Sequence, residues 1–449
     1  MTGLLDKYAT ATVPRYTSYP PAPHLRAGFP AATYRDWLSR LDPARSLSLY
    51  LHVPFCRQLC WYCGCNMKLA SRYEPVAAYV EALIAEIALI AGILPGRFAV
   101  SHLHFGGGTP TALEPDDLAR VMENIRDRFD ILPDAERAIE SDPRTLTDAM
   151  IATLGALRFN RASFGIQEFD PKVQAAINRI QPFEMVARAV EGLRGAGIPN
   201  INFDLIYGLP HQTVDSLART IAACLTLKPD RIALFGYAHV PWMAKKQRLI
   251  DEAALPRAAE RAAQAASAAS AITAAGYLAI GLDHFALPGD SLAKAAIAGT
   301  LRRNFQGYTD DAAETLIGLG ATSIGRLPQG YVQNIAEPGA WARAVGDGVL
   351  PIGKGRAFAG DDRIRGYVIE RLMCDGFVDL ASAGTRFGQP ADWYADALPL
   401  LEEMAQDGLL VLDDARLRMT ELGCPLVRVA ASAFDLYRRH SAARHSVAI

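Results

Sequence analysis

The sequence of 449 residues predicts an α/β protein built on a partial (β/α)6-type barrel. Short apolar or β-branched runs alternate with longer amphipathic runs, and such alternation indicates parallel strands joined by helical crossovers. Half of the residues are hydrophobic, which suffices for a large core. In barrels of this kind the reactive groups lie at the carboxyl ends of the strands. Glycine-rich and polar motifs follow several of the predicted strands, so the site is expected at that end.

Seven strands are predicted, at Leu47–Phe55, Ser101–Phe105, Ala138–Ser141, Arg161–Gln167, Asn200–Tyr207, Arg231–Tyr237 and Tyr277–Leu282. Six or seven strand–helix units suit a partial or complete barrel. Amphipathic patterns predict helices at Pro75–Ile93, Pro115–Phe129, Glu184–Gly195 and Thr213–Leu227, and an alanine-dense helix at Glu252–Ala275.

The pattern changes after about Gly339, where a helix is expected at 361–374 and a hairpin with an Asp-rich turn at 408–420. Helices followed by such a hairpin resemble a winged-helix module, which could contact DNA or serve as a lid or packing module. The basic run Arg438-Arg439-His440 is too short for a DNA-binding face, so we favour the lid or packing module. We expect an N-terminal segment (1–35) over the barrel mouth, a barrel (36–339) and a mainly helical C-terminal cover domain (340–449).

The charge balance excludes a general nucleic-acid binder, because 46 basic and 48 acidic residues give a formal net charge of −2. A local basic pocket for an acidic small molecule stays compatible with it. No targeting segment and no apolar run long enough to span a membrane is visible, so we expect a cytoplasmic protein without a membrane partner.

Four cysteines within ten residues are the strongest functional signal: Cys56, Cys60, Cys63 and Cys65. The first three have the spacing Cys-x3-Cys-x2-Cys. Three thiolates on one short loop can hold three irons of a [4Fe–4S] cluster and leave the fourth iron open to bind and reduce a small molecule. A zinc site would want a second ligand pair, and a disulfide framework does not suit a long chain without a signal peptide. The spacing therefore favours an open-site cluster over both alternatives.

Further polar and glycine motifs stand at strand ends. Gly106–Thr109 could cradle either a phosphate or an ammonium group, and the lysine of a P-loop is missing. Glu140 and Gln167 end two strands, and Asp142 reads more readily as a helix-capping acid. Asp204 lies inside an apolar strand, where it needs either an ion-pair partner or a ligand; we favour the ligand.

Together these motifs resemble the radical S-adenosylmethionine superfamily: the cysteine spacing, Gly-Gly-Gly-Thr-Pro at 106–110, and Asp-Leu-Ile-Tyr-Gly-Leu-Pro at 204–210. More closely, the chain resembles the family of oxygen-independent coproporphyrinogen III oxidases through Pro14–Pro20, Cys65 and the segment 303–309. Cys65 distinguishes it from the otherwise similar haem-chaperone relatives. The resemblance covers roughly residues 10–335 and implies a radical SAM barrel.

The resemblance implies a role for each matching position. Cys56, Cys60 and Cys63 would bind the cluster, and Cys65 would serve catalysis without being a ligand. Contacts to the cluster-bound S-adenosylmethionine would come from Tyr50, Gly107, Glu140 and Ile324. Contacts to a second S-adenosylmethionine would come from Tyr62, Gly108, Thr109, Gln167, Arg179, Asp204 and Ala238. Tyr62, also a candidate catalytic residue, stands where the family commonly has phenylalanine, so it keeps the aromatic face and adds a hydroxyl.

The implied reaction is the oxidative decarboxylation of two propionates of coproporphyrinogen III to vinyl groups through a 5′-deoxyadenosyl radical, giving protoporphyrinogen IX. A flavodoxin or ferredoxin would supply electrons, and a monomer is expected. Carboxylates of the substrate would want cations and hydroxyls, for which the candidates are Arg15, Tyr16, Tyr19, Arg302, Arg303 and Gln306. The alternatives are a haem-binding or haem-delivery protein on the same fold, or another radical SAM tetrapyrrole enzyme such as a methyltransferase, a cyclopropanase or a haem-opening enzyme.

Overall fold

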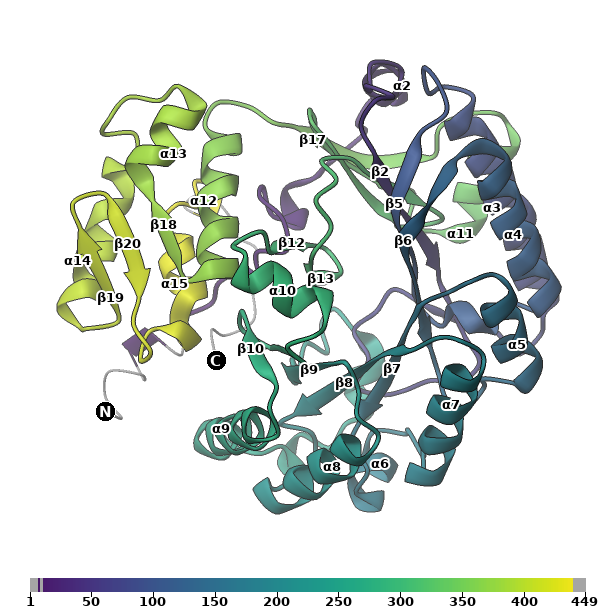
Figure 1. Cartoon of the computed structure of the whole chain (residues 1–449), viewed down its shortest axis with the longest axis horizontal. Coiled ribbons are helices and arrows are strands. Elements are labelled where there is room, and N and C mark those ends of the chain that lie inside the picture. Colours follow the sequence, from purple (N-terminus) through teal and green to yellow (C-terminus); the bar gives the residue numbers. More distant parts are fainter. Residues whose placement is uncertain (1–6, 9–10, 439–449) are drawn as a thin grey trace. The chain divides into compact units, whose positions relative to one another are not determined.

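The computed structural model describes residues 7–8 and 11–438, which form two compact units (Figure 1). The barrel unit comprises Arg26–Tyr277 and Ala313–Arg356. The second unit comprises the described residues up to Leu25, Leu278–Ala312 and those from Ala357 onward. This division differs from the boundaries expected from the sequence, because 278–312 groups with the two ends of the chain and 340–356 groups with the barrel. The position of residues 1–35 over the barrel mouth stays a prediction.

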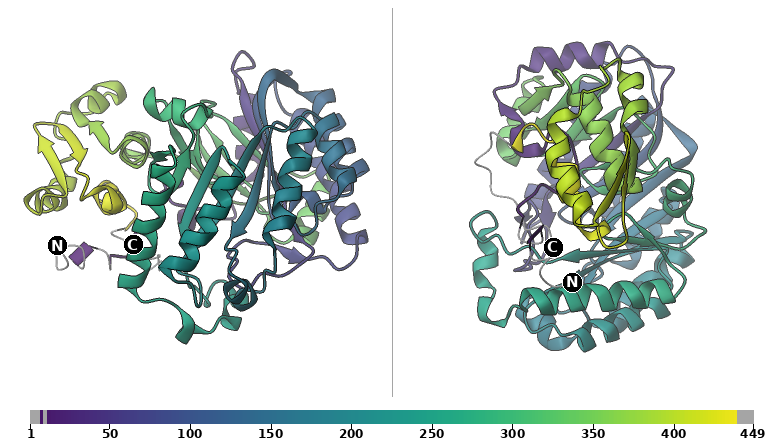
Figure 2. Two further views of the ribbon diagram at one scale, coloured as in Figure 1. Left: turned by 60° about the horizontal axis from the view of Figure 1, so that its bottom comes forward. Right: turned by 90° about the vertical axis from the view of Figure 1, so that its left-hand side faces the viewer.

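Six neighbouring parallel strands form the centre of the barrel unit, and crossover helices cover their outer face (Figure 1; Figure 2, left). The strands are β2 (Leu47–Val53), β5 (Ala99–Gly107), β6 (Asp130–Ser141), β7 (Arg161–Gln167), β8 (Asn200–Tyr207) and β9 (Arg231–Gly236). The helices between them are α3 (Glu74–Ala91), α4 (Pro115–Arg128), α5 (Asp148–Ala156), α6 (Pro171–Ala176), α7 (Phe183–Gly195) and α8 (Val214–Thr226). The predicted (β/α)6-type architecture is confirmed.

The sheet also extends beyond β2, which the sequence did not predict. β14 (Leu316–Leu319) pairs parallel with β2, and the sheet continues through β15 (Ile324–Leu327), β16 (Gly330–Asn334), β17 (Ile352–Ala357) and β1 (Arg26–Ala27). The helices of these regions are α2 (Ala31–Ser39) and α11 (Pro338–Gly346). β14 has only four residues, all buried, so its sequence pattern is too short to separate it from a loop.

Local signals explain most element boundaries. Proline in the first turn starts α3 and α4, and Thr213 begins α8 with a capping box to Ser216. The predicted helix at Glu252–Ala275 is wrong over its first six residues. A short 3₁₀ turn occupies 252–254, and α9 begins at Ala258 and ends at Ala274. Pro256 accounts for the shorter helix, because proline cannot donate the backbone hydrogen bond that an interior helical position requires.

The second unit is a mainly helical domain with small sheets (Figure 2, right). Its helices are α10 (Ser291–Ile297), α12 (Asp362–Asp375), α13 (Leu380–Phe387), α14 (Leu398–Gln406) and α15 (Val427–Ser432). The predicted hairpin is confirmed as β19 (Leu410–Asp413) and β20 (Arg416–Met419), with β18 (Phe377–Asp379) on the other side of β20. Arg439 and His440 of the basic run lie outside the described residues.

Two antiparallel hairpins of the second unit come from the middle of the chain. They are β10 (Leu278–Ile280) with β11 (His284–Ala286), and β12 (Arg302–Asn304) with β13 (Gly307–Thr309). The predicted strand Tyr277–Leu282 is thus part of a hairpin and not a seventh barrel repeat. Across the described part of the chain, no helix has the length and apolarity needed to cross a membrane.

Candidate active site

The cysteine loop follows β2 and runs between β3 (Phe55–Cys56) and β4 (Lys68–Leu69). Contacts from distant segments fix its course. Trp61 N donates to Ile177 O at 3.0 Å, and Asn178 Nδ2 donates to Leu59 O at 2.7 Å. Thr109 N donates to Phe55 O at 2.7 Å, which ties the loop to the glycine run after β5. The loop is therefore held at the carboxyl ends of the parallel strands, as predicted.

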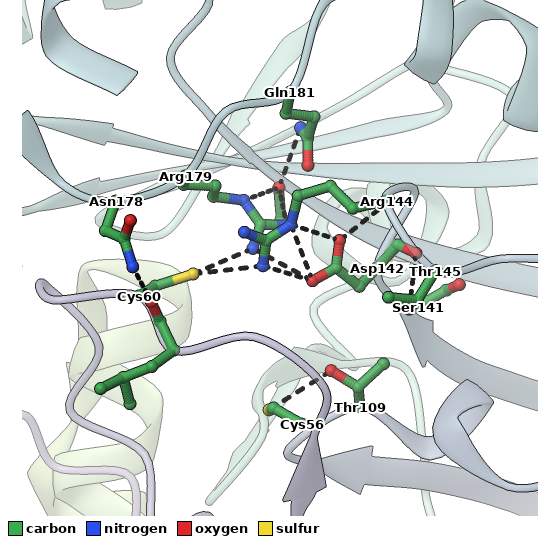
Figure 3. Close-up of polar contacts among 12 residues, drawn as sticks. Cys56, Cys60, Thr109, Ser141, Asp142, Arg144, Thr145, Asn178, Arg179 and Gln181 are labelled. Atoms are coloured by element: carbon green, nitrogen blue, oxygen red, sulfur yellow. Dashed lines mark hydrogen bonds and ion pairs between the residues drawn. The ribbon is translucent and has the colours of Figure 1, made fainter. Parts of the chain in front are cut away.

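Hydrogen-bond donors surround two of the sulfur atoms (Figure 3). Cys60 Sγ accepts from Arg144 Nη2 at 3.3 Å and from Arg179 Nη1 at 3.4 Å, while Thr109 Oγ1 donates to Cys56 Sγ at 3.4 Å. Asp142 joins both arginines, with its Oδ2 at 2.6 Å from Arg144 Nη2 and 3.4 Å from Arg179 Nη1. Donors of this kind stabilise the thiolate form that a metal cluster requires.

The other two thiols of the loop influence each other. The hydrogen bond from Cys65 lowers the pKa of Cys63 to about 6 against the effect of burial, and Lys246 adds to this shift. The same contact with Cys63 raises the pKa of Cys65, an exposed residue, well above its usual value. Burial raises the pKa of Cys56 to about 11. Of these two thiols, Cys63 is therefore the one that ionises more readily.

The donor set fits a [4Fe–4S] cluster. Three thiols stand on one loop, and two of their sulfur atoms accept hydrogen bonds from guanidinium or hydroxyl groups. In the part of the chain that the structure describes, no three Cys, His or carboxylate side chains converge on a single ion. A cluster does not require such convergence, because each thiolate binds a different iron.

The glycines at the end of β5 and just after it allow close packing against the neighbouring segments. At Gly107, with φ +112°, a Cβ atom would lie 2.4 Å from His52 Cε1. At Gly108 a Cβ atom would lie 2.7 Å from the backbone N and O of Phe55. A side chain at either position would therefore displace the backbone of the cysteine loop or the ring behind it.

Glu140 is the second-last residue of β6 and lies near the aromatic rings of Tyr50, His52 and His104. Its Oε1 lies 3.4 Å from His104 Nε2, and its Oε2 accepts from Gly107 N at 2.9 Å. The ring of Tyr50 stacks on His104 with centroids 5.8 Å apart, and its Oη lies 3.0 Å from His52 Nδ1. Burial alone would raise the pKa of Glu140, but the contacts with His104 and Gly107 outweigh it and lower that pKa. An ionised carboxylate here suits an ammonium group or ribose hydroxyls.

Ile324 reaches this region through the unpredicted strand β14. Gly318 of β14 pairs with Tyr50, and a Cβ atom on Gly318 would lie 2.9 Å from the carbonyl carbon of Ile324. Ile324 thus lies beside the strand that flanks Tyr50, although the two residues are far apart in the sequence.

Gln167 and Asp204 present oxygen atoms that the described residues leave without hydrogen-bond partners. The side-chain Oε1 of Gln167 is buried and accepts no hydrogen bond there, and the residue itself has φ +65°. Asp204 in β8 likewise has no hydrogen bond or ion pair to another described side chain. Burial, with the nearby charge of Glu140, raises its pKa to about 7. The structural ion pair considered for Asp204 is therefore absent from the described residues, and its oxygens are available to a ligand.

Arg179 is also held in place on the β7 side of the site, because its Nη2 donates to Gly165 O at 2.6 Å.

Tyr62 and Ala238 are connected by hydrogen bonds to a residue that the sequence did not indicate. Gln247 Nε2 donates to Tyr62 O at 2.7 Å and to Ala238 O at 3.1 Å. The ring of Tyr62 packs on the buried cluster that contains Ile177.

Two site residues were thus missed from the sequence, Arg144 and Gln247. Arg144 is two residues from Asp142, which was read as a capping acid; the carboxylate also accepts from Arg144 N at 3.0 Å, so it shapes the turn as well. The short segment Asp142-Pro143-Arg144 could have indicated an ion pair between its aspartate and its arginine. Gln247 lies in a polar 3₁₀ turn, and nothing in its sequence surroundings indicates a role.

Several residues of the second unit that were expected to bind substrate carboxylates are already hydrogen-bonded or ion-paired within the protein. Tyr16 Oη donates to Asp435 at 3.0 Å and Tyr19 Oη to Phe434 O at 3.4 Å, and both rings are buried in the core of that unit. The core-packing alternative therefore describes both tyrosines. Arg302 Nη1 binds Glu370 at 3.2 Å.

Comparison with known proteins agrees with this geometry. The family model of the radical SAM superfamily matches residues 50–224, and that of the HemN C-terminal domain matches residues 358–426. The solved structure of coproporphyrinogen III oxidase (HemN) from Escherichia coli is similar with a TM-score of 0.90 and 38% identity, covering 94% of this chain and 97% of that one.

Curated relatives match over nearly their full length. An oxygen-independent coproporphyrinogen III oxidase of Bradyrhizobium diazoefficiens is 49% identical over 446 residues, 99% of each chain. One from Paracoccus denitrificans is 44% identical over 447 residues, 100% of this chain and 98% of the relative.

A parallel barrel with three thiols on the loop after its first strand defines a radical SAM enzyme, which works with a [4Fe–4S] cluster and S-adenosylmethionine. At this level of similarity the assignment can be narrower. The chain belongs to the family of oxygen-independent coproporphyrinogen III oxidases.

Proposed function

We propose that this protein converts coproporphyrinogen III to protoporphyrinogen IX without oxygen, by oxidative decarboxylation of two propionate side chains. Full-length similarity to oxidases named for this substrate supports the choice of substrate. The observation that carries the radical chemistry is the three-thiol loop at the carboxyl ends of the strands, with Cys60 held between two guanidinium groups. The presence of Cys65 favours this function over that of a haem-delivery protein.

Specific side chains would hold the cluster and its ligand. Cys56, Cys60 and Cys63 would each bind one iron and leave the fourth iron for S-adenosylmethionine. When bound, these groups supply a 5′-deoxyadenosyl radical that removes a hydrogen atom from the β-carbon of a propionate. Loss of CO2 and of one electron to an external one-electron acceptor then leaves the vinyl group.

Residues around the cluster would orient that S-adenosylmethionine and exclude water. Glu140 is ionised and would hold a cationic or hydroxyl group of the ligand. Tyr50 would present its ring, Gly107 permits close approach of the backbone, and Ile324 would supply an apolar contact. Preorganised groups of this kind fix the bond to be cleaved close to the open iron.

We also propose a second S-adenosylmethionine site. Its contacts would be Tyr62, Gly108, Thr109, Gln167, Arg179, Asp204 and Ala238. The unpartnered oxygens of Gln167 and Asp204 support it, as does the hydrogen bonding of Gln247 that brings Tyr62 and Ala238 together. The test is the stoichiometry of a single-turnover reaction. Two 5′-deoxyadenosines for each protoporphyrinogen, with two molecules bound in equilibrium dialysis, are expected; one bound molecule would contradict the second site.

The cellular setting belongs to the same proposal. A flavodoxin- or ferredoxin-like protein would deliver single electrons to the cluster, and the enzyme would act as a monomer in the cytoplasm. Sedimentation of the cluster-loaded enzyme tests the monomer, and reduction of the cluster by each purified donor tests the electron source.

The deciding experiment is an anaerobic assay with the cluster-loaded, reduced enzyme, S-adenosylmethionine and coproporphyrinogen III. Product mass should correspond to the loss of two CO2 and four further hydrogens for each porphyrinogen, two hydrogens from each converted propionate. A Cys60→Ser variant should be inactive, whereas Cys424→Ser, which changes an exposed cysteine outside the loop, should be active. Formation of 5′-deoxyadenosine without a decarboxylated product would refute the substrate. A gain of methyl groups would favour a methyltransferase, and stoichiometric haem binding without turnover a delivery protein.

A further inference from the structure

The buried guanidinium of Arg303 in the second unit has hydrogen-bonding capacity that the described residues leave unused. Arg303 is only 8% exposed, and its Nε and Nη1 atoms have no hydrogen-bond partner in the described part of the chain. Its remaining nitrogen, Nη2, donates only a long bond of 3.4 Å to Arg15 O. Burying unpaired donors on a charged group is costly, so a fold that keeps them has a reason to do so.

The position of this guanidinium is well fixed. It lies over the ring of Tyr308, 4.3 Å from the ring centroid. Tyr308 is held in turn, because its Oη donates to Met373 O at 2.8 Å and accepts from Leu282 N at 3.1 Å. Stacking on an aromatic face supports the cation but uses none of its N–H donors. The free donors of Arg303 are therefore preorganised.

Two more arginines make the surroundings strongly positive. Arg428 is 7% exposed and donates to Val13 O at 3.3 Å. Arg15, two residues after Val13 in the chain, is exposed. Burial, with the positive charges of Arg15 and Arg303, lowers the pKa of Arg428 to about 10. We call Arg15, Arg303 and Arg428 the arginine cluster.

The carboxylates near the arginine cluster do not balance its charge. His284, with smaller effects of the charges of Arg303 and Arg15, lowers the pKa of Asp283 against the effect of burial, and Asp283 Oδ1 already lies 2.7 Å from His284 Nδ1. Glu370 accepts from Arg303 N at 3.2 Å, and its other oxygen binds Arg302. Near the three guanidinium groups, Asp283 is thus already paired with His284 and Glu370 with Arg302, which leaves an excess of positive charge at a place with free donors.

We propose that the arginine cluster is a carboxylate-binding site that holds a propionate of the tetrapyrrole substrate. The identity of the ligand rests on the proposed function. Guanidinium groups suit carboxylates because charge-assisted N–H···O bonds are short and strong. The site keeps two sequence candidates, Arg15 and Arg303, and adds Arg428, while Arg302 and the buried tyrosines are already engaged within the protein.

The test measures the affinity of the cluster-loaded enzyme for coproporphyrin III, the stable oxidised form of the substrate with the same four carboxylates, by quenching of porphyrin fluorescence. Arg303→Gln should raise the Kd roughly tenfold or more, and Arg15→Gln several-fold. Asp283→Asn should lower the Kd, because it removes the competing carboxylate. The matched control is Arg418→Gln, since Arg418 also lies over a ring, 4.6 Å from the centroid of Phe377, but is exposed on β20.

Equal Kd values for the wild type, Arg303→Gln, Arg15→Gln and Asp283→Asn would overturn the site. Arg15→Gln changes an exposed side chain and Asp283→Asn is nearly isosteric, so both decide the matter even where Arg303→Gln fails to fold. Variant defects should appear in KM and not in the cleavage of S-adenosylmethionine without substrate. A wild type that makes protoporphyrinogen while the variants bind normally would refute this site alone. A wild type that does not bind coproporphyrin III at all would refute the proposed function as well.

Discussion

The carboxyl group of Glu86 in α3 should make the stability of the barrel unit depend on pH. Its side chain is fully buried and accepts from Gly320 N and from Asn334 Nδ2, each at 2.6 Å. Burial raises its pKa to about 7 in spite of these hydrogen bonds. Gly320 follows β14 and Asn334 ends β16, so this carboxyl links α3 to the strands on either side of Ile324.

The size and sign of the effect follow from linkage. In the unfolded chain the carboxyl titrates near its ordinary value of 4.5, so between 4.5 and about 7 the folded protein keeps a proton that the unfolded chain releases. The free energy of unfolding therefore falls as pH rises through this window. A pKa difference of one is worth about 1.4 kcal/mol. The full cost is about 3 kcal/mol well above pH 7, of which about 2.5 kcal/mol develops between about pH 5 and about pH 8.

Urea unfolding followed by tryptophan fluorescence, at several pH values across that range, measures this cost. Glu86→Gln cannot ionise, so its stability relative to the wild type should improve by about 2.5 kcal/mol from the acidic to the alkaline end. Glu81→Gln on the same helix is the control, because Glu81 is exposed and pairs with Arg120 at the surface. Parallel pH profiles for the wild type and Glu86→Gln would refute the reasoning.

Three further predictions concern the site. Gly107→Ala should lose S-adenosylmethionine binding in equilibrium dialysis, because the new Cβ would lie 2.4 Å from the ring of His52; Gly195→Ala, at the end of α7 with open space around it, should bind normally. Asp142→Asn should destabilise the protein by about 3–5 kcal/mol, since it leaves two buried arginines unpaired. It should also speed iron loss to a chelator, and an unchanged rate would contradict the role of this network. Cys65→Ser should keep the visible absorption of the cluster but make no protoporphyrinogen, and loss of that absorption would identify Cys65 as a ligand.

Strands that lie in the middle of the sheet could be predicted closely from the sequence. Arg161–Gln167 and Asn200–Tyr207 match β7 and β8 to the residue, because each is a run of buried and half-buried residues that ends at a turn. β14 could not be predicted in the same way. Its four residues become a strand by pairing with β2, more than 260 positions earlier, and such pairing leaves no local signal.

The residues of the candidate site likewise fall into those with a local sequence signal and those without one. Glu140 and Gln167 could be predicted because a polar residue at the end of an apolar strand is conspicuous. Arg144 and Gln247 could not, because their partners are the sulfur of Cys60 and the backbone carbonyls of distant loops. A backbone acceptor is the same in every residue, so the sequence does not reveal which loop it will face.

The arrangement of charge around the cysteine loop bears directly on the proposed chemistry. Arg144 and Arg179 stand at Cys60, where a bound cluster would bring negative charge, and hydrogen bonds to cluster sulfurs favour the reduced state. Glu140 carries the opposite charge and raises the pKa of the nearby Asp204. A sulfonium compound is a cation, so carboxylates favour its binding. It must also accept an electron, which requires a cluster whose reduced state is stabilised. The barrel supplies both because β6, β7 and β8 end at the same edge, where a few residues on neighbouring strands separate the two kinds of charge.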